Sequence, residues 1–435
     1  MLLIHLPPET LYQIACSCPG RQDVVSLALS CKYLYEIASR GPLQYFDIRS
    51  RLQSPALWSR LSDPDNLKAH LVHSLTILHD FYGDDVNAYL VNEDVPVQER
   101  VPEQYRREPD TWLVKYSSIE ELRKDERALI SALKRMVNLR RFRWFRYYSP
   151  ESKGEWDLWR TINELGNVDE IDIVDLLPAP WPGVTSFELP FIVESPSFWS
   201  LRGVTSFTFR ADGPERDGSS VDLTPMYQML VDCPHLKNLS MDVGVLLVQS
   251  ADMLLQHGTW PNLSSIRMFG FTCYLAIITQ FLNRHPALEQ AKLPHPQVVL
   301  PLEDCMLSDG ALPNLSSLEY QAGTAAAILQ NPTAAQNLRN IAGINLRDMC
   351  RLEKRNGDPW DRVLALWRAH LIEGIKMRPS ISSLKLLSYQ PSYLLKLAGL
   401  APQLTELDLD LFEDDFDPNP LTNYITECSP SEGDT

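Results

Sequence analysis

The sequence predicts an α/β fold: a solenoid of strand–helix units with parallel strands on its concave face, preceded by a small three-helix module. Two observations predict the solenoid. A short apolar phrase recurs along most of the chain, and helix-like runs separate its copies. Three short amphipathic stretches at the N-terminus predict the module. Because 435 residues exceed the usual limit for one hydrophobic core, we expect several domains or one elongated repeat array.

Residues 6–40 have the pattern of three short helices. Pro7 and Pro8 suit the first turn of a helix, where a missing N–H costs nothing, and the macrodipole favours an anion at Glu9. Each helix has one apolar face, formed by Leu11, Ile14, Ala15 and Cys18, then by Val24, Leu27, Ala28 and Cys31, and finally by Leu34, Ile37 and Ala38. We expect Gly41 and Pro42 to close the module. A module this small buries little core, so a partner or the next domain should cover its outer faces.

The recurring phrase is an apolar residue, two variable residues, an apolar residue, one variable residue and a third apolar residue. The clearest copies begin at Leu236, Leu263, Leu315, Ile381 and Leu404, and weaker copies begin at Leu43, Val72, Leu139, Val168, Val184, Val204, Leu288 and Ile341. From 236 to 341 the starts are separated by 27, 25, 27 and 26 residues. Most clear copies follow a proline and one further residue, a turn signal that fixes where each strand begins.

Helix-like runs lie between these phrases, at residues 119–136, 222–232, 245–257, 272–284, 360–376 and 391–400. A helix-then-strand unit of this length is best satisfied by parallel strands on one side and helices on the other. Residues 82–111, 211–221 and 351–359 are irregular and are expected to form loops between repeats. The acidic tail from residue 412 has little to bury and is expected to be disordered.

Two parts of this pattern resemble a known family. The opening LPPE, the apolar spacing, Asp23 and the segment SCKYLYEIA are similar to the F-box, and the phrases resemble the leucine-rich repeats that often follow an F-box. The resemblance implies an F-box over 1–40, an irregular leucine-rich-repeat horseshoe over 41–411 and an acidic tail over 412–435. One departure is that the Asn or Cys of regular repeats is absent, since the corresponding positions hold Gly244, Phe271, Pro296, Gly323, Met349, Tyr389 and Phe412. An irregular α/β protein with an ordinary helical cap is the alternative.

The function that the resemblance implies is that of a substrate-recognition subunit of an SCF-type (Skp–cullin–F-box) ubiquitin ligase. The F-box would bind a Skp-family adaptor and through it a cullin, and the repeats would hold a protein substrate. The positions that match adaptor-contacting or supporting residues of the family are Leu6, Pro7, Glu9, Leu11, Ile14, Leu27 and Leu34. A scaffold that causes no degradation, or an unrecognised enzyme with a site in the irregular loops, is the alternative.

Strand alternation predicts which residues could hold the substrate. Leu139, Phe142 and Trp144 take the inward positions, which places Arg141, Arg143 and Phe145 on the exposed concave face. The same register predicts a substrate-binding face lined by Arg143, Arg210, Arg267, Lys292 and Arg347, with Lys385, Asp242, Glu319 and Asp408 beside them. Arginine suits a protein ligand with carboxylates or phosphates because it forms bidentate hydrogen bonds. Each of these residues could equally be a solvated strand residue.

Composition and motifs narrow the function classes. The net charge of −16 argues against binding to nucleic acid or to an anionic membrane, because phosphates would repel the chain. The sequence contains no nucleophile elbow, phosphate-binding loop or metalloprotease helix, so we expect a non-catalytic protein without a cofactor. The eight cysteines lack paired metal spacing and are expected to be buried thiols. Because neither a signal peptide nor a membrane-spanning stretch is predicted, we expect a cytoplasmic or nuclear location.

Overall fold

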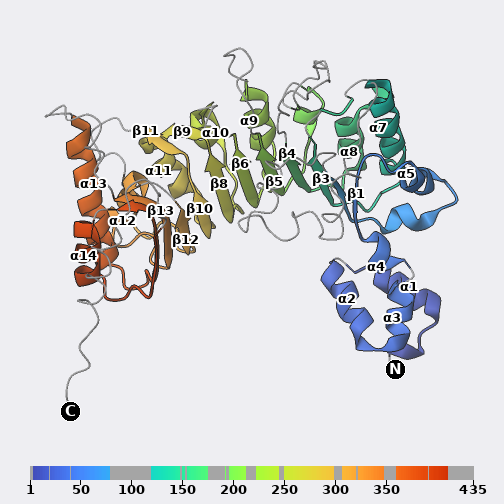
Figure 1. Cartoon of the computed structure of the whole chain (residues 1–435), viewed down its shortest axis with the longest axis horizontal. Coiled ribbons are helices and arrows are strands. Elements are labelled where there is room, and N and C mark those ends of the chain that lie inside the picture. The colour runs from blue at the N-terminus through green and yellow to red at the C-terminus, as the bar shows by residue number, and fades with distance from the viewer. Residues whose placement is uncertain are drawn as a thin grey trace. The chain divides into compact units, whose positions relative to one another are not determined.

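The structure is a computed structural model that describes residues 3–18, 20–39, 41–78, 119–146, 149–151, 154–174, 192, 195–211, 222–243, 249–297, 306–319, 322–346, 359–389 and 391–409. It divides into two compact units, Met1–Leu247 and Val248–Thr435. The phrase at Val184, the acidic tail, Arg347 and nearly all of the three predicted loops lie outside the described residues. Figure 1 shows the helices and strands of both units.

The first unit begins with a small group of helices, called here the N-terminal helical unit: η1 (Leu3–His5), α1 (Pro8–Cys16), α2 (Arg21–Ser30), α3 (Lys32–Ser39) and α4 (Pro42–Tyr45). Pro8 occupies the first turn of α1, as expected, and the Asp23 side chain accepts the backbone N–H of Gly20 at 3.1 Å at the start of α2.

Two clusters form the core of the N-terminal helical unit. Leu11, Leu34 and Ile37 form one cluster, and Val24, Ala28, Ala38 and Phe46 form the other. The prediction that Pro42 ends the helices was wrong, because Pro42 begins α4 as its first helical residue. Leu43 and Phe46 then pack into the second cluster, so the core extends past residue 40.

The rest of the first unit is an array of parallel strands joined by helical connections. Its strands are β1 (Asp47–Ser50), β2 (Ser74–Ile77), β3 (Arg141–Phe145), β4 (Glu170–Val174), β5 (Ser206–Arg210) and β6 (Asn238–Asp242), each paired with the next in chain order. Its described helices are α5 (Pro55–Ser62), η2 (Leu67–Leu71), α7 (Ile119–Leu133), η5 (Gly154–Trp156), α8 (Leu158–Leu165), η7 (Phe198–Ser200) and α9 (Thr224–Val231). A crossover of this kind is what a parallel pair of strands requires.

The second unit repeats this plan. Its parallel strands are β8 (Ser265–Phe269), β10 (Gln290–Lys292), β12 (Ser317–Glu319), β13 (Asn340–Leu346), β14 (Ser383–Tyr389) and β15 (Glu406–Leu409). Its described helices are α10 (Asp252–His257), α11 (Leu275–Arg284), α12 (Ala322–Gln330), α13 (Pro359–Lys376) and α14 (Pro391–Leu400). A small parallel sheet is formed by β7 (Gln249–Ser250), β9 (Phe271–Tyr274) and β11 (His295–Gln297). The helix predicted from residue 272 therefore starts only at Leu275.

The same backbone turn precedes each strand and accounts for the regular spacing of the recurring phrase. The N–H groups of Glu289 and Gln290 both donate to the carbonyl of Ser264, at 2.8 and 3.1 Å. The N–H groups of Ser316 and Ser317 in turn donate to Glu289, at 2.9 and 3.2 Å. The same doubled bond links every successive pair of strands from β1 to β6 and from β8 to β15 along the two arrays. The regular step of the sequence therefore corresponds to one strand of the array.

Two weak copies of the phrase were placed in the wrong register. Ile341 pairs with Leu318, the second apolar residue of its phrase, so the copy begins at Leu338. A bulge in β13 after Ile341 brings Ile344 into the core and produced the misleading spacing. Near the N-terminus, Ile48 pairs with Leu75, so that copy begins at Tyr45 and not at Leu43.

The inward positions of the strands form the core. Phe142 and Trp144 are fully buried, as predicted, and contact Trp159 of α8 with ring centroids 6.0 and 6.3 Å apart. Trp159 contacts Phe198, whose ring in turn lies 6.2 Å from Phe207 of β5. Edge-to-face contacts of this kind add to the burial of large apolar surfaces.

The last phrase departs from this pattern. Leu407 of β15 is 49% exposed, although its place in the phrase predicts burial. β15 ends the described part of the second array, and no further described repeat covers Leu407. An inward position in a stacked array is buried only where a neighbouring repeat lies over it.

Candidate functional site

The seven residues predicted to contact or support an adaptor differ in exposure. Leu11 and Leu34 are buried in one cluster of the N-terminal helical unit, and Leu6, Ile14 and Leu27 pack against that cluster while half-buried. Pro7 and Glu9 are exposed. Leu11 and Leu34 therefore stabilise the fold of the N-terminal helical unit from its core. The other five residues are accessible to a partner without rearrangement of that core.

Other apolar side chains of the N-terminal helical unit are more exposed than the leucine and isoleucine residues of this set. Leu29 of α2 is 78% exposed, Tyr35 of α3 is 54% exposed, and Tyr33 and Leu3 are also exposed. Leu29 lies off the apolar face of α2, among exposed serines, which is the sequence signal that could have identified it. These exposed apolar side chains, on three helices of one small unit, are available to a partner.

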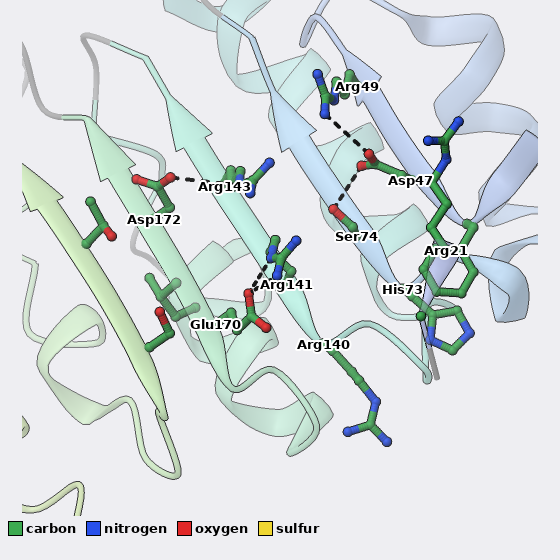
Figure 2. Close-up of a pocket in the computed structure, with 15 residues that line it drawn as sticks. Arg21, Asp47, Arg49, His73, Ser74, Arg140, Arg141, Arg143, Glu170 and Asp172 are labelled. Carbon is green, nitrogen blue, oxygen red and sulfur yellow. Dashed lines mark hydrogen bonds and ion pairs between the residues drawn. The ribbon is translucent and has the colours of Figure 1, made fainter. Parts of the chain in front are cut away.

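A polar pocket of about 480 Å³ lies on the strands β1 to β5 (Figure 2). Arg141 and Arg143 line it and alternate along β3 with Phe142 and Trp144, so the pocket is on the face opposite those two rings. Its lining residues are Gly20, Arg21, Phe46, Asp47, Arg49, His73, Ser74, Arg140, Arg141, Arg143, Glu170, Ile171, Asp172, Ser206 and Thr208. Gly20 and Arg21 come from the start of α2. The pocket therefore combines the N-terminal helical unit with the first strands of the array.

Strand pairing arranges the polar side chains of the pocket in two rows. The first row contains Asp47, Ser74, Arg141, Glu170 and Ser206, each opposite the next on adjacent strands. The second row contains Arg49, Arg143, Asp172 and Thr208, with the buried Thr76 of β2, which does not line the pocket, between Arg49 and Arg143. The two rows are two residues apart along the strands, so their side chains share one face of the sheet.

Most charges in these rows pair within the pocket. Arg141 forms an ion pair and a hydrogen bond with Glu170, and Arg143 lies 3.8 Å from Asp172. Asp47 accepts a hydrogen bond from Ser74 Oγ at 2.9 Å and lies 3.5 Å from Arg49. Opposite charges on adjacent strands stabilise the sheet locally.

Two arginines of the pocket differ from the others. Among the described residues, neither Arg21 nor Arg140 forms a salt bridge with a carboxylate, and both are exposed. Arg140 does act electrostatically on Asp169 and His73. Figure 2 shows His73 between Arg21 and Arg140 along the edge of the pocket.

The imidazole ring of His73, which lies beside these two arginines, is neutral. Its ring stacks on Phe46 with centroids 4.4 Å apart and an interplanar angle of 9°. Burial lowers the pKa of His73, and the nearby Arg140 guanidinium lowers it further. The positive charge at this end of the pocket therefore comes from Arg21 and Arg140.

The predicted concave-face residues Arg143 and Phe145 lie on the expected face, but the expected exposure was wrong. Arg143 is only 7% exposed and Phe145 is also buried. Adjacent strands crowd Arg143 on both sides, and Phe145 pairs with Val174 of β4. Burial lowers the pKa of Arg143, and Asp172 opposes that shift.

The remaining predicted face residues fall in both units. In the first unit Arg210 lies opposite Asp242 at the end of β5. In the second unit Arg267, Lys292 and Glu319 lie side by side on β8, β10 and β12, where Lys292 pairs with Glu319 and lies 5.3 Å from the Phe269 ring. Lys385 lies 3.3 Å from Asp408. The structure thus groups Arg267 with Lys292, while Arg347 lies outside the described residues.

Of the residues that line this pocket, the sequence alone predicted only Arg141 and Arg143 to lie on the strand face. It missed the carboxylate and hydroxyl residues and also the basic residues Arg21, Arg49, His73 and Arg140. Alignment of the phrases on their first apolar residue would have identified His73 and Arg140, because each directly follows that residue. No sequence pattern connects Arg21 to them, since it comes from a separate helix.

Other kinds of site were considered for the described residues. Within them, no group of three or more His, Cys, Asp or Glu residues is arranged to hold a metal ion. The described cysteines 16, 18, 31, 233 and 273 are free thiols, and burial raises the pKa of Cys16 and Cys233. None of the described helices is both long enough and apolar enough to cross a membrane.

Comparison with known proteins adds no assignment: no protein-family model matches the chain, and no curated protein matches it in sequence.

Proposed function

We propose that this chain is a substrate-recognition subunit of an SCF-type ubiquitin ligase, in which an F-box is followed by an irregular leucine-rich-repeat horseshoe. The N-terminal helical unit would bind a Skp-family adaptor and through it a cullin. The strand arrays would hold a protein substrate in the cytoplasm or nucleus. The chain itself would perform no covalent step.

The observation that supports this proposal most is the exposed apolar surface of the N-terminal helical unit. Leu29, Tyr33 and Tyr35 are exposed on a unit whose own core consists of two small clusters. Exposed aromatic and leucine side chains become favourable when a partner covers them. A docking unit of this kind, followed by arrays with polar strand faces, suits a protein that joins two partners.

The proposed mechanism is proximity. A subunit that holds substrate and adaptor together raises the effective concentration of the substrate near the ubiquitin-loaded conjugating enzyme. A stacked array keeps this distance defined, whereas a flexible linker would dilute the gain. The scaffold alternative uses the same two surfaces and differs only in the fate of the partner.

The test is co-purification of the full chain with a Skp-family adaptor. Leu6→Asp combined with Leu27→Asp should abolish binding, but both side chains pack against the core, so circular dichroism must confirm folding. Pro7→Asp is the sharper variant, because Pro7 is exposed at the N-cap of α1, where Asp is favoured. It should weaken adaptor binding while the helices stay intact.

The matched control is Ser59→Asp, at an exposed position of α5 outside the N-terminal helical unit. It adds the same charge and should leave adaptor binding unchanged. Adaptor recovery at the parental level with Pro7→Asp and with the double variant would contradict the F-box proposal. Deletion of residues 1–40 is a poorer test, because it would uncover Leu43 and Phe46.

A further inference from the structure

We infer that the polar pocket on β1 to β5 binds a primary carboxamide group, whose oxygen accepts hydrogen bonds from Arg143 of β3 and whose NH2 group donates to Asp172 of β4. An Asn or Gln side chain of a protein, or a small amide, carries such a group. The inference concerns the chain alone and does not depend on adaptor binding. Under the proposed function, the carboxamide would belong to the protein substrate.

Arg143 is a buried arginine that finds no hydrogen-bond acceptor among the described residues. It lines the pocket although it is only 7% exposed. Its Nε atom lies 3.8 Å from Oδ2 of Asp172, which makes an ion pair but is too far for a hydrogen bond. Its neighbour on β2, Thr76, does not accept one either, because the Thr76 hydroxyl is buried without a hydrogen-bond partner. A buried guanidinium without acceptors is costly, so a ligand that supplies them is stabilised in the pocket.

Arg378 shows how this chain satisfies another buried arginine. Arg378 is 3% exposed and donates to the backbone carbonyls of four residues in the preceding repeat. Arg143 is buried to a similar extent but faces a pocket of about 480 Å³, and no described carbonyl accepts a hydrogen bond from it. An occupant of the pocket can therefore provide the acceptor that Arg143 lacks within the chain.

The charges nearest to Arg143 balance, which favours a neutral ligand. Among the described residues, Asp172 and Asp47 are the acidic groups that act on Arg143, and Arg141 and Arg49 are the basic groups. Figure 2 shows Asp172 and Asp47 on opposite sides of Arg143. A carboxylate or phosphate that approached Arg143 would also approach Asp172, 3.8 Å away, and would be repelled by it.

The pocket as a whole is balanced in the same way. Its lining includes five arginines and three carboxylates. Two further carboxylates lie beside the lining: Asp23 accepts the backbone N–H of Gly20, and Asp169 interacts electrostatically with Arg140. Burial lowers the pKa of His73, so its ring adds no charge at neutral pH. The pocket therefore has no excess of positive charge to attract an anion, in a chain whose net charge is −16.

A primary carboxamide matches a donor that lies beside an acceptor. Arg143 and Asp172 are paired residues on adjacent strands, so a guanidinium and a carboxylate lie next to each other on one face. A carboxamide presents its oxygen and one N–H on the same edge, so it can bond to both. A trans peptide group directs its C=O and N–H to opposite sides and matches them less well. The volume of about 480 Å³ exceeds that of a carboxamide, which leaves room for the chain that carries it, beside the hydroxyl groups of Ser206 and Thr208.

The test is isothermal titration of the full chain with four probes. They are propionamide and three peptides, acetyl-Gly-Ala-Gln-Ala-Gly-N-methylamide and the same peptide with Glu or Met in place of Gln. The blocked ends remove other charges and other primary amides, and the three side chains are similar in size. Saturable binding of the Gln peptide is expected, with binding of the Glu and Met peptides weaker by about tenfold or more, as for the loss of a hydrogen bond to a charged group.

The same titrations identify the source of the carboxamide. Tighter binding of the Gln peptide than of propionamide indicates a protein, and binding of propionamide that is as tight or tighter indicates a small amide. Absence of binding by both amide probes would overturn the inference. So would binding of the Glu or Met peptide as tightly as the Gln peptide.

Variants locate the binding to Arg143 and Asp172. Arg143→Met removes the donors and keeps an apolar stem, so it should weaken binding of the Gln peptide about tenfold or more. The matched control is Arg160→Met, since Arg160 is exposed on α8 and pairs with Glu164. It should leave binding unchanged. Circular dichroism must confirm that both variants fold.

Asp172→Asn is the second variant and keeps the shape of the side chain, so the inference stays testable if Arg143→Met does not fold. It removes the negative charge beside Arg143. The affinity of the Glu peptide relative to the Gln peptide should therefore rise about threefold or more. An unchanged ratio of these two affinities, or equal losses of binding with Arg143→Met and Arg160→Met, would show that the carboxamide does not bind at this pair.

Discussion

Trp260 and His285 occupy equivalent positions in two successive repeats, and the backbone N–H of Trp260 donates a hydrogen bond to Nε2 of His285 at 3.0 Å. Each precedes a proline, and each carbonyl accepts the N–H of the first apolar residue of its phrase, Leu263 or Leu288. His285 Nδ1 lies 2.7 Å from the carbonyl of Phe281. Because Nε2 accepts a hydrogen bond, Nδ1 carries the proton and the ring is neutral. The residues that precede the two prolines therefore connect successive repeats through this hydrogen bond.

The stability of the second unit should depend on the protonation of His285. Burial lowers the pKa of His285 in the folded chain, whereas the unfolded side chain titrates near about 6.5. Below that pH the unfolded state binds more protons, so the free energy of unfolding should fall as the pH falls from 7.5 to 5.5. His285→Gln keeps an acceptor and a donor without a titrating ring, and should flatten this dependence by up to about 1.4 kcal/mol per pH unit. Urea unfolding at several pH values measures it.

The control for this prediction is His257→Gln, a change of an exposed histidine at the end of α10. Among the residues that the structure describes, Arg284 is the charged group that acts on His285, and it lowers the pKa of the ring further. If His285→Gln retained the pH dependence of the parent protein, the buried ring would not be its source.

Arg378 occupies the same repeat position and should contribute strongly to stability. It is buried and donates to the carbonyls of Ile328, Leu329, Asn331 and Ala334 in the preceding repeat, at the C-terminal end of α12. Burial lowers its pKa to about 10, so it stays charged at neutral pH. Arg378→Met leaves these carbonyls unpaired and should reduce the free energy of unfolding by about 3 kcal/mol or more.

Lys376→Met is the matched control for Arg378→Met, because Lys376 is an exposed residue at the end of α13 that pairs with Glu373. It should change the free energy of unfolding by less than about 1 kcal/mol. Chemical denaturation of both variants compares them directly. If both variants lowered the free energy of unfolding equally, the hydrogen bonds from Arg378 to these carbonyls would not contribute to stability as predicted.

Two glycine-to-alanine changes should shift stability in opposite directions. A Cβ at Gly258 would lie 2.4 Å from the buried ring of Trp260 and 2.7 Å from the carbonyl oxygen of Leu254, so Gly258→Ala should cost about 1–3 kcal/mol. A Cβ at Gly399 in α14 meets no atom within 4 Å, so Gly399→Ala should gain up to about 1 kcal/mol of helix propensity. Thermal unfolding of the two variants tests both signs, and a stabilising Gly258→Ala would refute the close approach.

The sequence was sufficient to predict the parallel strand–helix units and most strand positions. Leu236, Leu239 and Met241 are buried as their spacing predicts, and the steps between Leu236, Leu263, Leu288 and Leu315 correspond to single strands. Such patterns are local, because alternation along a strand and the turn before it both depend on a few adjacent residues. The phrases at Leu43 and Ile341 were misplaced because α4 and the bulge in β13 produce apolar spacings of their own.

The candidate site was predicted less completely. The sequence indicated an arginine-bearing strand face and named Arg141 and Arg143 of the pocket, but it missed Arg21 and His73. Arg143 lies on the expected face and is nevertheless buried, since exposure depends on the adjacent strands.

The sequence by itself determined the order of helices and strands, because periodicity and turn residues act over short distances. Only the tertiary structure decided which charges meet. Arg21 and Arg140 are separated by more than a hundred residues in the chain and line one pocket because the start of α2 reaches the first strands. Trp260 and His285 each precede a proline in the sequence, and the hydrogen bond between them forms only because their repeats stack. Contacts of this kind depend on how elements pack, which a local pattern does not encode.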